Sequence, residues 1–127
     1  MSEKVKFEIE FPIHASPKML YQYFGSASGL SEWFADNVNS RGKKYIFIWD
    51  GSEEVAERIA QKNDVFIRFK WEEDEDDDTY FELKIEVDDL TKDVSLLVVD
   101  FADEDEVEES KMIWENQISE LKHVIGG

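Results

Sequence analysis

The chain contains no cysteine, which excludes a disulfide framework, a thiolate nucleophile and a zinc site built on cysteine. No apolar run approaches the roughly 18 residues that cross a bilayer. The first residues, Met1–Lys4, lead directly into an alternating segment and not into the apolar core of a signal peptide. We therefore expect a cytoplasmic protein that does not insert into a membrane.

Basic residues are also scarce. The 14 lysines and arginines stand against 31 acidic residues, so the formal net charge is −17. A negative field of this size repels nucleic acid and anionic lipid head groups, so we expect no nucleic-acid partner and a basic surface on any protein partner. Apolar residues make up 42% of the 127 positions, enough for one globular domain spanning residues 1–127. We expect it to be a monomer.

One apolar stripe dominates the end of the chain and predicts an amphipathic helix over residues 105–125. At about 100° per residue, the stripe collects Val107, Ile113, Trp114, Ile118, Leu121, Val124 and Ile125. A helix of about 30 Å with a single apolar face needs a large partner surface. Gly126 and Gly127 supply the stop signal of a helix end.

Alternating apolar and polar residues predict the strands that supply this surface. They cover residues 5–11, 44–49, 53–61, 65–71, 80–87 and 94–101. The segment 53–61 has a composition that also suits a helix, but its position between two turns favours a strand. Two short helices are predicted between the first two strands, one from Ser16 to about residue 24 and one over residues 28–35.

Short turns between consecutive strands indicate antiparallel pairing. We therefore predict an α+β fold in which a curved antiparallel sheet of about six strands wraps the long C-terminal helix.

Several stretches of the chain resemble a known family in order and spacing. They are Ile13 to Phe24 with its Ala-Ser-Pro, Leu30-Ser31-Glu32-Trp33-Phe34, Phe69-Lys70-Trp71, and Trp114 with Leu121-Lys122. Together they are similar to the START-like or SRPBCC superfamily, the helix-grip fold, and most to the family related to the activator of the large heat-shock ATPase chaperone. The resemblance implies a hydrophobic cavity between sheet and long helix. Members bind lipids, sterols, polyketides or hormones, act as cyclases, or bind only proteins, so the fold alone does not select a function.

The candidate residues for lining this cavity are mostly large rings: Trp33, Phe34, Phe47, Trp49, Phe69, Trp71, Trp114 and Gln117. Such rings with few polar groups suit an apolar ligand, but the same rings could simply fill a core, and both interpretations stay open. Gln117 lies within the apolar arc of the helix, where its amide needs a partner. A backbone carbonyl and a polar group of a ligand are the two alternatives.

The remaining polar residues point to no chemistry. The acidic run Glu72–Asp78 predicts a solvated hairpin tip, with a basic partner or calcium as alternatives, although it lacks the spacing of a calcium loop. His14 and His123 have no partner nearby in the sequence, and no serine has nucleophile-elbow spacing, so we predict no catalytic residue, metal site or cofactor. We expect Arg58 and Arg68 to point outward and pair with acids; turned inward, they would reach a ligand carboxylate.

These observations predict a small non-enzymatic domain that binds an apolar, lipid- or polyketide-like molecule between sheet and C-terminal helix. The alternative is a protein-interaction module resembling a chaperone ATPase activator, whose acidic surface meets a basic partner. A cyclase-type enzyme ranks third, because no carboxylate–histidine pair falls on the expected apolar faces.

Overall fold

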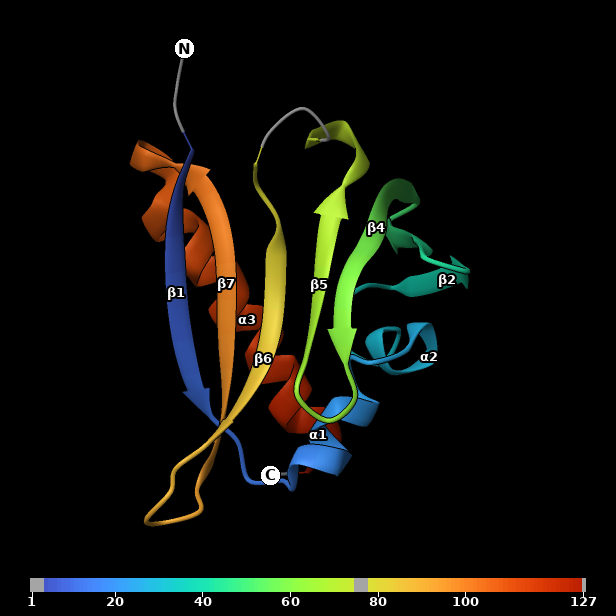
Figure 1. Ribbon diagram of the computed structural model, residues 1–127. Coiled ribbons are helices and arrows are strands. Elements are labelled where there is room, and N and C mark those ends of the chain that lie inside the picture. The colour runs from blue at the N-terminus through green and yellow to red at the C-terminus, as the bar shows by residue number, and fades with distance from the viewer. Residues whose placement is uncertain (1–3, 75–77, 127) are drawn as a thin grey trace.

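A long helix packs against one antiparallel sheet in the computed structural model, which describes residues 4–74 and 78–126 (Figure 1). Within these residues the strands are β1 (Lys4–Pro12), β2 (Asn37–Arg41), β3 (Lys44–Trp49), β4 (Ser52–Lys62), β5 (Phe66–Trp71), β6 (Phe81–Val87) and β7 (Val94–Asp103). The helices are α1 (Pro17–Gln22), α2 (Ala27–Leu30) and α3 (Val107–Ile125), with 3₁₀ turns η1 (Glu72–Asp74) and η2 (Glu104–Glu106). The predicted α+β helix-grip fold is confirmed.

The sheet has the order β1-β7-β6-β5-β4-β3-β2, and every neighbouring pair is antiparallel. The first strand therefore lies beside the last. Figure 1 shows α3 crossing behind the sheet, from the end where β1 begins to the end occupied by α1. Because side chains alternate along a strand, one face of the sheet meets α3, and we call it the inner face.

Helix α3 buries the predicted stripe, since Trp114, Ile118 and Leu121 each expose 5% of their surface or less. It ends at Gly126, whose φ of 85° is left-handed and whose N–H returns to the carbonyls of the last turn. Ile113 was expected to widen the stripe, and this is wrong, because Ile113 is 54% exposed. It is turned about 100° from Trp114 around the helix, away from the line of contact.

The two short helices are placed as predicted, but the second is shorter. Ser16 caps α1 by accepting a hydrogen bond from the Met19 N–H at 3.1 Å. Helix α2 ends at Leu30, and the turns that follow bring both Trp33 and Phe34 into the core, so the predicted helix over 28–35 is wrong in its second half. Gly29 permits the close packing of α2 on α1, because a Cβ there would lie 2.0 Å from the Gln22 carbonyl oxygen.

Two strands show where pairing outweighs composition. Strand β4 confirms the prediction for 53–61, because hydrogen bonding to β3 and β5 on both sides overrides the helical composition. Strand β2 was not predicted, and the sheet has seven strands in its described residues where about six were expected. Its only apolar residue, Val38, is buried opposite Phe47. A strand at the edge of the sheet needs little apolar surface beyond this one side chain.

Candidate functional site

The predicted cavity residues lie together beneath α3, and their rings pack on one another. The Phe34 ring centroid lies 5.3 to 5.7 Å from those of Phe47, Trp49, Phe81 and Trp114. These edge-to-face and stacked contacts are the arrangements that aromatic side chains prefer. We call the group the aromatic cluster: Trp33, Phe34, Phe47, Trp49, Phe69, Trp71, Phe81 and Trp114. That these rings bind a ligand stays a prediction.

The polar atoms of this region find partners inside the chain. Gln117 Nε2 donates a hydrogen bond to the Phe34 carbonyl oxygen at 3.1 Å, and Trp49 Nε1 donates to the same oxygen at 2.9 Å. Trp33 Nε1 donates to the Tyr23 carbonyl oxygen at 2.7 Å. The backbone-carbonyl alternative for Gln117 is therefore confirmed, and its amide ties α3 to the turns after α2.

One carboxylate lies on the inner face among the rings. Asp100 of β7 is mostly buried and stands in register with Phe7 of β1. Its Oδ2 accepts a hydrogen bond from Trp114 Nε1 at 2.8 Å, and its Oδ1 accepts one from the Phe101 backbone N–H at 2.7 Å. Burial raises the pKa of Asp100 to about 6, although these two bonds and the charge of Lys4 act in the opposite direction.

Alternation along β7 could have identified Asp100 from the sequence. Leu96 and Val98 lie four and two residues before it and expose none of their surface. A carboxylate that continues such a series must face the core. Because the segment 94–101 is apolar at nearly every position, its single carboxylate drew no prediction.

Asp100 borders a pocket of about 230 Å³ at the end of the sheet where β1 begins. We call it the Asp100 pocket, and its lining includes Lys4, Glu54, Trp71, Asp74, Tyr80 and Asp100. Lys4 Nζ lies 3.1 Å from Asp74 Oδ1, so an ion pair links β1 to η1 beside the pocket. Burial, and after it the charge of Glu73, raises the pKa of Glu54. The pocket therefore combines carboxylates with aromatic residues.

Trp71 connects this pocket to the interior. Its ring centroid lies 5.5 Å from that of Phe47 and 5.1 Å from that of Phe81, both buried on the inner face. The same ring lines the Asp100 pocket. Trp71 therefore marks the boundary between the aromatic cluster and the surface.

Arg58 and Arg68 lie on opposite faces of the sheet. On the outer face Arg68 Nη2 and Nε lie 2.8 and 2.9 Å from Glu82 Oε1, so the expected pairing with an acid is confirmed for Arg68. Arg58 stands opposite Phe69 on the inner side, contrary to the outward direction we expected. Its Nη1 donates a hydrogen bond to the Tyr45 hydroxyl oxygen at 3.5 Å. Arg58 thus contributes to the polar edge of the core.

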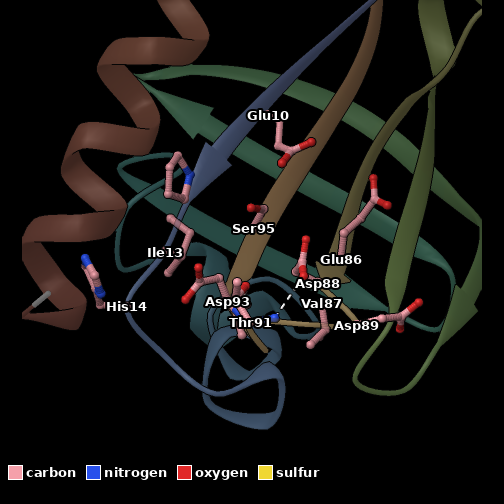
Figure 2. A pocket seen from close by; sticks show the side chains of 12 residues that line it. Glu10, Ile13, His14, Glu86, Val87, Asp88, Asp89, Thr91, Asp93 and Ser95 are labelled. Carbon is pink, nitrogen blue, oxygen red and sulfur yellow. Dashed lines mark hydrogen bonds between the residues drawn. The ribbon is translucent and has the colours of Figure 1, made fainter.

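A larger hollow of about 670 Å³ lies where β1 ends against the β6–β7 hairpin (Figure 2). We call it the hairpin groove, and its lining includes Glu10, Ile13, His14, Glu86, Asp88 and Asp93. Figure 2 shows the carboxylates spread along it and His14 beside the end of α3. None of the described residues that line it is a lysine or an arginine. The groove is therefore acidic.

A third acidic group stands at the start of α3. The carboxylates of Asp103, Asp105 and Glu106 each place an oxygen within 4.8 Å of the others, and a hydrogen bond with Asp103 raises the pKa of Glu106. Asp105 and Glu106 are exposed, as is common for acidic surface groups, and our expectation of no metal site stays a prediction. Of the acidic run Glu72–Asp78, residues 75–77 lie outside the described residues, so its calcium and hairpin-tip interpretations stay open.

Comparison with known proteins places this fold. The sequence profile of the START-like superfamily domain matches residues 1–127. A protein from Bacteroides fragilis, solved by NMR in solution, is 33% identical, and the match covers 98% of this chain and 91% of that chain with a TM-score of 0.66. No curated protein matches the chain.

Two more distant structures share the fold. The Aha1 dimer from Colwellia psychrerythraea is 14% identical, with 93% of each chain covered and a TM-score of 0.74. A crystal structure from Mesorhizobium loti is 13% identical, with 96% of this chain and 97% of that chain covered and a TM-score of 0.77. At these identities the likeness shows the fold alone. Within the described ranges, no helix has the length and apolar character needed to cross a membrane.

Proposed function

Because the chain belongs to the START-like superfamily, we propose that it binds an apolar small molecule, lipid- or polyketide-like, between the inner face of its sheet and α3. Domains of this superfamily bind hydrophobic molecules or serve as interaction modules. The aromatic cluster provides apolar surface, and burying a ligand against it contributes roughly 25 cal/mol per Å². The polar groups at the Asp100 pocket would orient the ligand.

The observation that carries this proposal is the position of Trp71, which belongs both to the aromatic cluster and to the Asp100 pocket. The pocket, at about 230 Å³, is smaller than the roughly 300–1,000 Å³ typical of sites for drug-sized ligands. It therefore holds one end of the molecule. The rest would lie along the rings after Trp71 adopts another rotamer.

Two measurements test the proposal. Native mass spectrometry of protein purified from its own host should show a bound small molecule. Nile red, a neutral apolar dye, should bind the purified protein with a rise in fluorescence. The substitution Trp71→Ala removes the ring and should raise the Kd of Nile red about fivefold. This corresponds to a loss of about 1 kcal/mol of binding free energy.

The matched control is Met112→Ala, which removes a side chain that is 63% exposed on α3 and should leave dye binding unchanged. The proposal fails if no molecule copurifies and the dye does not bind. Equal dye binding by Trp71→Ala and the unaltered chain would exclude the Asp100 pocket as the place that holds one end of the ligand.

A second candidate is an interaction module for a basic protein, and the hairpin groove favours it. A groove lined by carboxylates, on a chain of net charge −17, complements a basic surface. The chain should then capture an ATPase chaperone in a pull-down that weakens steeply with salt. Glu10→Gln with Glu86→Gln should weaken capture, whereas Glu115→Gln with Glu120→Gln, an equal charge change on α3, should not. Capture that does not depend on salt concentration, or that weakens equally in both double variants, would exclude the hairpin groove as the interface.

A further inference from the structure

Asp100 is a negative group on an apolar face, and its neutralisation is incomplete. An ionised carboxylate offers about four acceptor positions. Asp100 uses them for two donors, Trp114 Nε1 and the Phe101 backbone N–H, and makes no ion pair with any residue that the structure describes. A buried charge of this kind is costly unless a cation or further donors approach it. Asp100 itself lines the Asp100 pocket.

The other groups around the pocket favour a cation. Glu54 approaches from β4, and Glu73 and Asp74 approach from η1. Lys4 supplies the one lysine among the described lining residues, and it is paired with Asp74. An anionic ligand would meet repulsion here, and a neutral one would leave the charge of Asp100 as it is.

The Trp71 ring selects among cations. Trp71 packs on the inner-face rings of Phe47 and Phe81 and lines the same pocket as Asp100. Aromatic faces attract organic ammonium groups, and the attraction increases where water is excluded. A metal ion would instead prefer several oxygen ligands converging on one point. A carboxylate beside an aromatic ring is therefore better suited to an amine.

We propose that the Asp100 pocket holds the ammonium group of an amphipathic amine, with Asp100 as its counter-ion and the Trp71 ring beside it. This inference rests on the proposed function, because the apolar part of the same ligand would lie along the aromatic cluster. Lys4 competes with the ligand, since its own charge lies close enough to lower the pKa of Asp100. Removal of Lys4 should therefore strengthen amine binding.

The experiment compares three probes of equal length by isothermal titration calorimetry at pH 7 in physiological salt. They are 4-phenylbutylamine, the neutral 4-phenyl-1-butanol and the anionic 4-phenylbutyrate. The amine should bind about tenfold more tightly than the alcohol. This is the advantage expected from one partly desolvated interaction of an ammonium group with its counter-ion and ring. The butyrate should bind most weakly.

Three variants locate the effect. Asp100→Asn should reduce the advantage of the amine over the alcohol to about twofold or less, since the counter-ion is gone. Asp89→Asn removes the same charge from the exposed β6–β7 hairpin and should preserve the advantage. Lys4→Met should tighten amine binding and leave alcohol binding unchanged. Circular dichroism establishes that each variant is folded.

The outcomes separate the two proposals. Equal affinity for amine and alcohol would overturn the counter-ion while leaving the apolar site intact. An advantage that persists in Asp100→Asn, or that is lost equally in Asp89→Asn, would also overturn it, because the amine would then be responding to net charge. Weaker amine binding by Lys4→Met would overturn the competing role of Lys4. If none of the probes binds and Nile red does not bind either, the proposed function fails as well.

Discussion

The two faces of the sheet each bury a carboxylate, and they neutralise it differently. On the outer face Glu82 is 8% exposed and pairs with Arg68, whose guanidinium carbon lies 4.2 Å from the centre of the Tyr80 ring. On the inner face Asp100 is held by two N–H donors and, among the described residues, by no ion pair. The charge of Glu82 is therefore neutralised by a residue of the same chain.

The difference indicates what each carboxylate does. Glu82 has the cation that a buried acid needs, so its contribution is to the stability of the outer face. Asp100 remains destabilised when ionised, and it adjoins a pocket. Ionisable groups in such unfavourable surroundings gather at functional sites. The inner face is therefore the better place to search for a ligand.

The largest expected effect concerns the apolar content of the two faces. Phe47→Ala should lower the free energy of unfolding by about 3–5 kcal/mol, because the ring is fully buried among other rings. Phe66→Ala, on the outer face, should cost less than half as much because Phe66 is only half-buried. Urea unfolding monitored by circular dichroism measures both. Equal losses would show that the outer face is as much a core as the inner one.

The second effect is a pH dependence that belongs to the inner carboxylate. The pKa of Asp100 is raised to about 6 in the folded chain from an ordinary value of 3.8, so the folded state holds a proton that the unfolded state has released. Stability from this group is therefore present at low pH and lost as pH rises through about 6. Between pH 4.5 and 7.5 the loss should be about 2 kcal/mol.

Asp100→Asn should remove that component, which makes its profile flatter than that of the unaltered chain over this range. Lys4, Glu54 and Asp74 line the same pocket and are present in both proteins, so the comparison isolates Asp100. Asp89→Asn in the exposed hairpin should retain the full slope. Parallel profiles for Asp100→Asn and the unaltered chain would mean that Asp100 is solvated.

The smallest effect concerns the outer pair. Arg68→Met should leave Glu82 buried without its cation and lower the free energy of unfolding by about 1–2 kcal/mol, less than for a fully buried pair because the Arg68 side chain is 36% exposed. Adding Glu82→Gln should restore most of the loss. Thermal and urea unfolding at pH 7 give both values. A double variant no more stable than the single one would show that Arg68 acts through Tyr80 and not through the ion pair.

Much of the fold followed from local patterns. The stripe of α3 and the alternation of β1, β5 and β6 are periodic over enough residues to be unambiguous. The hairpin at Asp50-Gly51 was also predictable, and both residues have the positive φ angles, 49° and 83°, that such a turn requires. Strand β2 was missed because a five-residue edge segment with one apolar side chain carries no periodic signal.

The candidate site also has a part that was predictable from the sequence and a part that was not. The aromatic members were predictable, because large apolar side chains on inward positions must meet beneath the helix. The Asp100 pocket was not, since it joins β1, β4, η1 and β7, which are distant in the chain. Its contacts depend on the angle at which α3 crosses the sheet and on where β1 begins relative to η1.

The periodicity and the charge of the sequence therefore determined that this chain forms a sheet packed against one long helix, and that its surface is strongly acidic. Both properties arise within short stretches of the chain, so the residue types of those stretches are enough to predict them. The partners of Gln117 and Trp114, the inward turn of Arg58 and the burial of Asp100 were decided only when distant elements packed together. Hydrogen bonding and desolvation act over a few ångströms, and residues that close come together only in the folded chain.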